Sequence, residues 1–138
     1  MATITSQSVD ETIAVGSEFA LRLRGGDVIA LDGDLGAGKT HFVKGLAAGL
    51  GYSGEVTSPT FNLVHEYRGS ALTLYHFDFY RLKKAAELTG IGFEEYLEDP
   101  AGVSVIEWAS RFPEILPDAT LRVSIESAGE NSRKIDLP

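Results

Sequence analysis

The pattern of apolar and polar positions predicts a strand, a loop and a helix in the first third of the chain. Residues 28–31 are a short apolar run, which is typical of a strand buried on both faces. Residues 41–50 continue as a helix and end near the glycines at 49 and 51. A second apolar run at residues 103–106 ends in an acid, Glu107, and predicts another short strand.

A further helix is predicted before the first apolar run. Ser8 and Glu11 have the S-x-x-E spacing of a capping box. Apolar residues then recur at roughly helical spacing up to Leu23, after which two glycines end the helix. Residues 3–5 predict a short edge strand in front of it.

The rest of the pattern predicts a β-hairpin, two short helices and a closing antiparallel pair of strands. Two strand-like runs flank an Arg-Gly-Ser turn, and two glycines interrupt the helix formers that follow. The hairpin strands are residues 61–67 and 72–79, the helices lie within residues 83–97, and the closing strands are residues 121–127 and 134–137.

The loop after the first apolar run has the spacing G-x-x-x-x-G-K-[ST], with Gly33, Gly38, Lys39 and Thr40 at the defining positions. Such a turn points backbone N–H groups at phosphate oxygens, and the next helix adds a partial positive charge. The lysine reaches the β- and γ-phosphates, and the threonine hydroxyl ligates Mg²⁺. A glycine-rich turn without a ligand is the alternative.

This phosphate loop, or P-loop, defines the predicted fold and the first set of site residues. We expect an α/β protein with a P-loop NTPase-like three-layer fold, in which helices flank a mixed central sheet that includes the β-hairpin and the antiparallel C-terminal strands. The predicted nucleotide-binding residues of the loop are Gly33, Asp34, Leu35, Gly36, Ala37, Gly38, Lys39, Thr40 and His41.

A P-loop needs an acidic partner at the end of a neighbouring strand, which holds Mg²⁺ directly or through water. Asp78 and Glu107 both end strand-like runs, and the sequence does not choose between them. Asp78 also shares a strand face with His76, across the hairpin from His65. A transition-metal site there competes with structural histidines.

Two further features lie where they can complete the site. The hydroxyls of residues 57–60, including Thr60, are either a γ-phosphate sensor or a turn made rigid by a proline. Trp108 is expected on the strand face opposite Glu107, where it stacks on a nucleotide or partner or fills the core. Thr12 either approaches the base or is a plain helix residue.

The nucleotide is expected to be ATP. GTPases commonly carry N-K-x-D after the P-loop, and neither Asn62 nor Asn131 is followed by lysine. The D-x-x-G sequence at residues 99–102 precedes a strand where a GTPase motif would follow one.

Composition and charge narrow the class of protein. With 138 residues, 43% of them hydrophobic, the chain suits one domain over residues 1–138. Without cysteine, a signal-peptide pattern or a membrane-length apolar run, a cytoplasmic protein with no membrane association is expected. Its net charge of −8 disfavours direct binding of nucleic acid. The small basic group at residues 81–84 is either a solvated helix start or a local binding patch.

Four motifs, taken in order, resemble the TsaE family along nearly the whole chain. They are the P-loop at residues 33–40, Ser-Pro-Thr-Phe at 58–61, His-Phe-Asp-Phe-Tyr-Arg at 76–81 and Glu-Trp at 107–108. This family comprises small bacterial P-loop ATPases required, with partner proteins, for threonylcarbamoyl modification of the adenosine beside the anticodon in certain tRNAs.

The resemblance implies roles for individual residues. Residues 33–40 would hold ATP, and Thr40 and Glu107 would hold Mg²⁺. Asp78 would act near the γ-phosphate, on the metal or on the attacking water. Two departures, His41 for Thr or Ser and Phe79 for Leu, leave the assignment intact, because position 41 offers mainly its backbone N–H. The resemblance also implies that Thr60 belongs to the nucleotide-sensing loop and that Trp108 lies close to the site, and it leaves open whether Thr12 or Arg133 contacts the base.

The expected function is Mg²⁺-dependent ATP hydrolysis, with Lys39, Asp78 and Glu107 as the catalytic residues. No arginine is obviously placed to stabilise the transition state, so turnover by the chain alone should be slow and partner proteins should stimulate it. The implied partner is the two-protein threonylcarbamoyl transferase complex, which would link this chain to tRNA only indirectly. The alternatives are a small-molecule kinase and a non-catalytic ATP-sensing adaptor.

Overall fold

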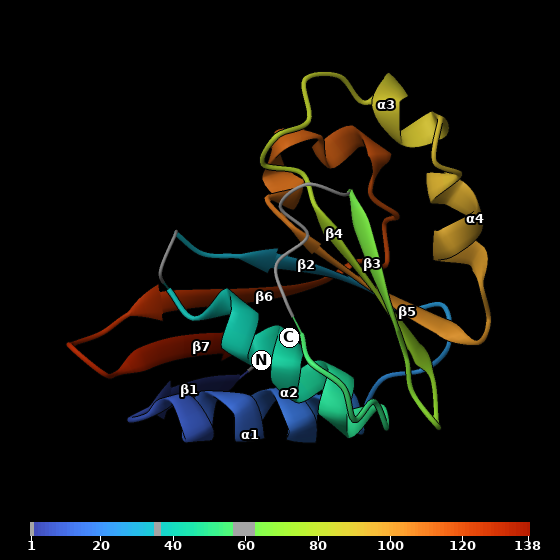
Figure 1. Cartoon of the computed structure of the whole chain (residues 1–138). Coiled ribbons are helices and arrows are strands. Elements are labelled where there is room, and N and C mark those ends of the chain that lie inside the picture. The colour runs from blue at the N-terminus through green and yellow to red at the C-terminus, as the bar shows by residue number, and fades with distance from the viewer. Residues whose placement is uncertain (1, 35–36, 57–62) are drawn as a thin grey trace.

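A seven-stranded mixed sheet forms the centre of the molecule (Figure 1), with strand order β1-β7-β6-β2-β5-β4-β3. The structure is a computed structural model and describes residues 2–34, 37–56 and 63–138. The strands are β1 (Ala2–Ser6), β2 (Val28–Asp32), β3 (Val64–Arg68), β4 (Thr73–Asp78), β5 (Gly102–Glu107), β6 (Leu121–Ser127) and β7 (Arg133–Leu137).

The helices are α1 (Val9–Ala20), α2 (Lys39–Gly49), α3 (Ala86–Thr89) and α4 (Phe93–Glu98), followed by 3₁₀ turns at Ala109–Arg111 and Pro113–Ile115. Ser8 caps α1 as the sequence predicts: its Oγ accepts the Glu11 N–H at 3.1 Å, and the Glu11 carboxylate accepts the Gln7 N–H. The helix ends at Ala20, three residues before the predicted end, because the N–H groups of Arg22 and Leu23 reach back only three residues.

The sheet is parallel in the middle and antiparallel at both edges. Strands β4 and β6 flank the parallel pair β2 and β5, and both run parallel to their neighbours in that pair. The predicted hairpin is β3 and β4, and the predicted closing pair is β6 and β7; both predictions are confirmed. Strand β1 then adds to β7, with Ser6 opposite Arg133, so the start of α1 lies beside the start of β7.

Alternation along β2 explains why the protein has three layers. Ile29 and Leu31 point into the core beneath α1 and α2, whereas Val28 and Ala30 point into the core beneath α3, α4 and the 3₁₀ turns. Figure 1 shows α1 and α2 side by side along one side of the sheet and α3 and α4 at the far end of the molecule. Of the helices in the described residues, none has both the length and the apolar character to cross a membrane.

Candidate nucleotide site

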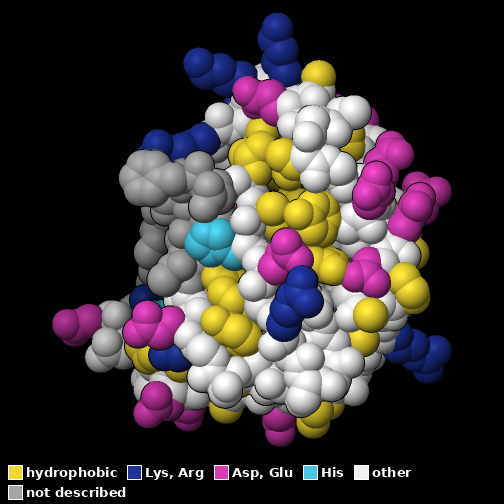
Figure 2. All heavy atoms as spheres, turned by 45° about the vertical axis from the view of Figure 1, so that its right-hand side comes forward, with side chains coloured by type: hydrophobic (Ala, Val, Ile, Leu, Met, Phe, Trp, Pro, Cys, Tyr) yellow, Lys and Arg dark blue, Asp and Glu magenta, His cyan; other side chains and the backbone are white. Residues whose placement is uncertain are grey.

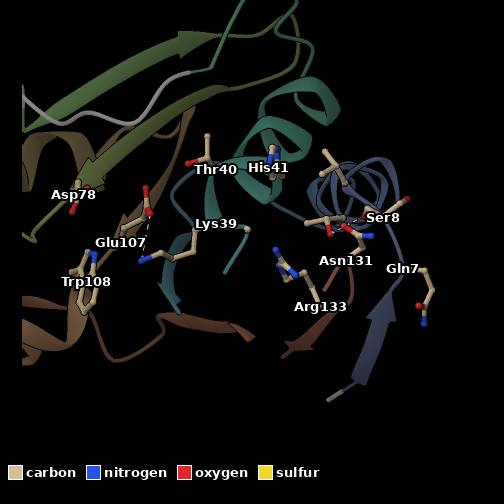
Figure 3. A pocket seen from close by; sticks show the side chains of 13 residues that line it. Gln7, Ser8, Lys39, Thr40, His41, Asp78, Glu107, Trp108, Asn131 and Arg133 are labelled. Carbon is tan, nitrogen blue, oxygen red and sulfur yellow. Dashed lines mark hydrogen bonds and ion pairs between the residues drawn. The ribbon is translucent and has the colours of Figure 1, made fainter. Parts of the chain in front are cut away.

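The end of the P-loop, residues 38–40, lines a pocket of about 410 Å³ where three parallel strands end (Figure 3). Strand β2 leads into the loop, α2 begins at Lys39, and the neighbouring strands β4 and β5 end at Asp78 and Glu107. The register pairs Asp78 directly with Glu107. Ligands bind at the carboxyl ends of the strands in such sheets, at the point where strand order reverses.

Lys39 is a buried cation with no hydrogen-bonding partner among the described residues. Its Nζ lies 3.7 Å from Glu107 Oε1 and 4.4 Å from the centre of the Trp108 ring. Only 5% of its side chain is exposed, and among the described residues none accepts a hydrogen bond from Nζ. A buried amine without an acceptor is unfavourable. Phosphate oxygens would supply acceptors for this amine.

The start of α2 borders the same pocket. The first N–H groups of an α-helix have no partner within it. The N-cap residue, Gly38, has no side chain to cap them, and its φ of 99° is a conformation that favours glycine. Thr40 and His41 follow on the first turn and line the pocket. Backbone donors at a helix N-terminus, beside a lysine, favour an anion.

Glu107 and Asp78 provide the negative side of the site. Glu107 is almost fully buried, and its Oε2 lies within hydrogen-bonding distance of His76 Nε2, at 2.5 Å. Asp78 is partly buried and accepts the Tyr80 N–H at 2.9 Å. Burial, assisted by the charge of Glu107, raises the pKa of Asp78 above its ordinary value of 3.8, although the Tyr80 N–H opposes the shift.

The donor set fits a magnesium–nucleotide complex. Carboxylate and hydroxyl oxygens, as supplied by Thr40, Asp78 and Glu107, are the ligands that Mg²⁺ prefers, with phosphates and water completing its shell. Within the described chain, no three His, Asp or Glu side chains form a metal-binding group by themselves. His76 is instead hydrogen-bonded to Glu107, and His65 contacts the Tyr67 hydroxyl at 3.1 Å.

Trp108 differs from its predicted orientation. The sequence places it on the strand face opposite Glu107, but β5 ends at Glu107 and Trp108 has a φ of 57°. This left-handed backbone breaks the strand alternation, so both side chains line one pocket. The Trp108 ring contacts Lys39 and also the Tyr80 ring, whose centre is 5.0 Å from its own.

Most residues at the far end of the pocket are ones that the sequence did not assign to the nucleotide site. Gln7, Ser8, Val9 and Asn131 line it, together with Thr12 and Arg133 (Figure 3). They meet there because β1 pairs with β7. No local signal in the sequence reports that pairing.

Thr12 and Arg133 both line this end of the pocket, but they make different contacts. The Thr12 hydroxyl lies 2.6 Å from Ser6 Oγ and 3.2 Å from the Ser8 carbonyl, so it is already hydrogen-bonded. The Arg133 side chain lies against the P-loop, since a Cβ added to Gly38 would be 3.4 Å from Arg133 Nε.

The other described P-loop residues that the sequence predicts to bind the nucleotide are not among those that line this pocket. Gly33 and Asp34 line an adjacent pocket of about 360 Å³, which they share with Trp108. Ala37 is buried in the core beneath α1 and α2. Three predicted nucleotide-binding residues lie outside the described residues: Leu35, Gly36 and Thr60.

Comparison with known proteins agrees with this architecture. The family model "Threonylcarbamoyl adenosine biosynthesis protein TsaE" matches residues 6–135. The chain belongs to the TsaE family. The crystal structure of Bacillus subtilis YdiB is similar in three dimensions: the match covers 97% of this chain and 82% of that chain, with a TM-score of 0.82 and 37% identity.

Relatives named "tRNA threonylcarbamoyladenosine biosynthesis protein TsaE" cover most of the sequence. The Bacillus subtilis protein is 44% identical over 91% of this chain and 78% of its own length. The Treponema pallidum protein is 44% identical over 96% of both. The Haemophilus influenzae protein is 36% identical over 99% of this chain and 90% of its own. The predicted family and P-loop NTPase-like fold are thus confirmed.

Proposed function

We propose that this chain is an Mg²⁺-dependent ATPase that acts with partner proteins in threonylcarbamoyl modification of the adenosine beside the anticodon in tRNA. The observation that carries the proposal is Lys39, whose buried Nζ lacks an acceptor among the described residues at the start of α2. The names of its TsaE relatives supply the pathway. We further propose one nucleotide-binding domain over residues 1–138, located in the cytoplasm.

The proposed roles follow from the positions of the side chains. Lys39 would exchange its contact with Glu107 for the β- and γ-phosphates, while the N–H groups of the loop bind their oxygens. Thr40 and Glu107 would hold Mg²⁺, which neutralises charge on the phosphates. Asp78, with its pKa raised by burial, would orient the attacking water as a stronger proton acceptor than an exposed aspartate.

The distribution of positive charge argues for a partner that completes the site. Of the described residues that line the pocket, only Lys39 and Arg133 carry a permanent positive charge. Figure 3 shows Arg133 at the end away from Asp78 and Glu107. An arginine beside the transferring phosphoryl group is worth about 10³–10⁵ in rate where it occurs. We therefore propose slow intrinsic turnover, stimulated by the two-protein threonylcarbamoyl transferase complex, with tRNA bound only through that complex.

The test is ATP turnover by the purified chain, alone and with the partner pair from the same organism. We expect slow turnover alone, an increase with the pair, and loss of both with Lys39→Ala. Fast turnover that the pair does not change would contradict the proposal. Dependence of turnover on an added metabolite would indicate a kinase instead. Modification that survives in Glu107→Ala or Asp78→Ala without hydrolysis would indicate a sensing adaptor.

A further inference from the structure

We infer that His76 is a positioning residue that fixes the Glu107 carboxylate for metal binding at the nucleotide site. The inference rests on the proposed ATPase function and deepens it. It assigns a role to a side chain that does not line the pocket and acts only through Glu107.

His76 is fully buried on β4 and touches Glu107 from the neighbouring strand β5. Its Nε2 lies 2.5 Å from Glu107 Oε2, and its ring packs against Tyr67, with ring centres 6.3 Å apart. The two strands are parallel partners. The contact is therefore built into the centre of the sheet and does not depend on a loop.

The second ring nitrogen indicates where the proton lies. His76 Nδ1 is also buried and has no hydrogen-bond partner within the described part of the chain. A neutral imidazole has one N–H donor and one acceptor nitrogen. A proton on Nδ1 would bury an unpaired donor and set the Nε2 lone pair against a carboxylate. We therefore place the proton on Nε2, where it is donated to Glu107.

This hydrogen bond makes the two oxygens of Glu107 unequal. Oε2 is held by His76, whereas Oε1 lies 3.7 Å from Lys39 Nζ. When Lys39 turns to the phosphates, it releases Oε1 but not Oε2. His76 then keeps the carboxylate in place, with Oε1 free for the metal. Ligand carboxylates in metal sites are commonly oriented by such a hydrogen bond.

The competing explanation is that His76 only fills space in the core. Three substitutions separate the two explanations. His76→Gln keeps an N–H donor at about the reach of Nε2, whereas His76→Asn is polar but too short to reach Glu107. His65→Asn is the matched control, because His65 is the register partner of His76 on β3 and contacts Tyr67 instead of Glu107.

The measurement is the affinity for the non-hydrolysable analogue AMP-PNP, by calorimetry, in EDTA and in Mg²⁺. We expect His76→Asn to reduce the gain in affinity from Mg²⁺ by about 10–100-fold, leaving the affinity in EDTA unchanged. His76→Gln should recover most of the gain, and His65→Asn should retain all of it. A normal gain in folded His76→Asn overturns the inference and leaves the proposed function intact. Failure of the wild-type chain to bind AMP-PNP overturns both.

A second measurement needs no substitution. The ¹⁵N chemical shifts of the His76 ring in the wild-type protein distinguish a protonated Nε2 from a protonated Nδ1. We expect the Nε2–H form. The Nδ1–H form would overturn the inference even if all three variants failed to fold.

Discussion

Trp108 occupies the most unusual backbone position in the described chain, where it alone among non-glycine residues has a positive φ. Such a conformation is unfavourable for a bulky side chain and is often found at functional sites. Here it turns the indole ring toward the Lys39 ammonium, at 4.4 Å from the ring centre. A ligand that moves the Lys39 ammonium should therefore change the surroundings of the ring.

Fluorescence should report this contact, because Trp108 is the only tryptophan in the sequence. If ATP draws the Lys39 ammonium away from the ring, we expect a saturable change in emission as ATP is titrated. Lys39→Met removes the cation and should give no comparable change. Calorimetric binding of ATP by the wild-type chain without any emission change would show that Lys39 stays on the ring.

Helices α1 and α2 cross closely enough for backbone to meet backbone. A Cβ at Gly45 would lie 2.1 Å from the Ile13 carbonyl oxygen and 3.0 Å from Gly16 Cα. The crossing fixes α2, and α2 carries Lys39 and Thr40 on its first turn. The packing of α1 against α2 therefore sets the position of Lys39 and Thr40, the last two residues of the P-loop.

Gly45→Ala should consequently destabilise the protein, although alanine is the better helix former. We expect a loss of about 1–3 kcal/mol in the free energy of unfolding, measured with urea, as for other overpacked sites. The control is Gly90→Ala, since Gly90 has an α-helical backbone. A Cβ added there would lie 3.5 Å from the Glu87 carbonyl oxygen, which is an ordinary contact distance. Equal effects of the two substitutions would refute the close-crossing explanation.

A second link between elements depends on pH. The Tyr75 hydroxyl on β4 donates a hydrogen bond to the Asp99 carboxylate after α4. This bond, with burial, raises the pKa of Tyr75 to about 12 from 10.0, and the same bond lowers the pKa of Asp99 below 3.8. The protonated tyrosine and ionised aspartate are thus the forms that the fold favours.

The hydrogen bond between Tyr75 and Asp99 should stabilise the protein only between an acid and an alkaline pH limit. It is present below the unfolded tyrosine pKa of 10.0 and is lost as the pH rises toward about 12. On the acid side, it is present above 3.8 and is lost as the pH falls through the lowered pKa of Asp99. Thermal unfolding of wild type and Tyr75→Phe should therefore differ most between these limits. A difference that persists unchanged at pH 12 would contradict this account.

At the scale of the whole molecule, charge limits what the surface can bind. The net charge is −8, and Figure 2 shows Asp and Glu side chains spread around a central apolar region on one face, with Lys and Arg scattered among them. A polyanion gains affinity chiefly by contact with clustered cations. The charge of the surface therefore agrees with the proposal that this chain reaches tRNA only through a partner.

We expect no binding of tRNA by the purified chain at physiological salt, by fluorescence anisotropy, and co-binding once the partner pair is added. Lowering the salt to about 50 mM makes the test stricter, because a protein with about 6–10 phosphate contacts binds about 10³–10⁵ times more tightly there than at about 200 mM. We expect no strong binding by the chain alone even at the lower salt. Submicromolar binding by the chain alone would contradict the indirect role.

The sequence predicts local structure well and long-range contacts poorly. Apolar runs identify β2 and β5, and glycine spacing identifies the P-loop, because each depends on neighbouring residues. Strand order is different: that Asp78 stands beside Glu107 follows from the pairing of β4 with β5, which neither motif encodes. For the same reason, the sequence does not predict the contact between His76 and Glu107. The predicted orientation of Trp108 is wrong because strand alternation ends at Glu107. Side-chain patterns do not predict the left-handed backbone that follows.

The pairing of β1 with β7 has a consequence for how the protein is made. One wall of the pocket combines Gln7 and Thr12 with Arg133, from opposite ends of the described sequence. Chains fold as they emerge from the ribosome, N-terminal parts first. The P-loop is synthesised early, but its pocket lacks a wall until β7 has emerged. A nascent chain therefore has no complete pocket, and any ligand of this pocket can stabilise the fold only after β7 has been synthesised.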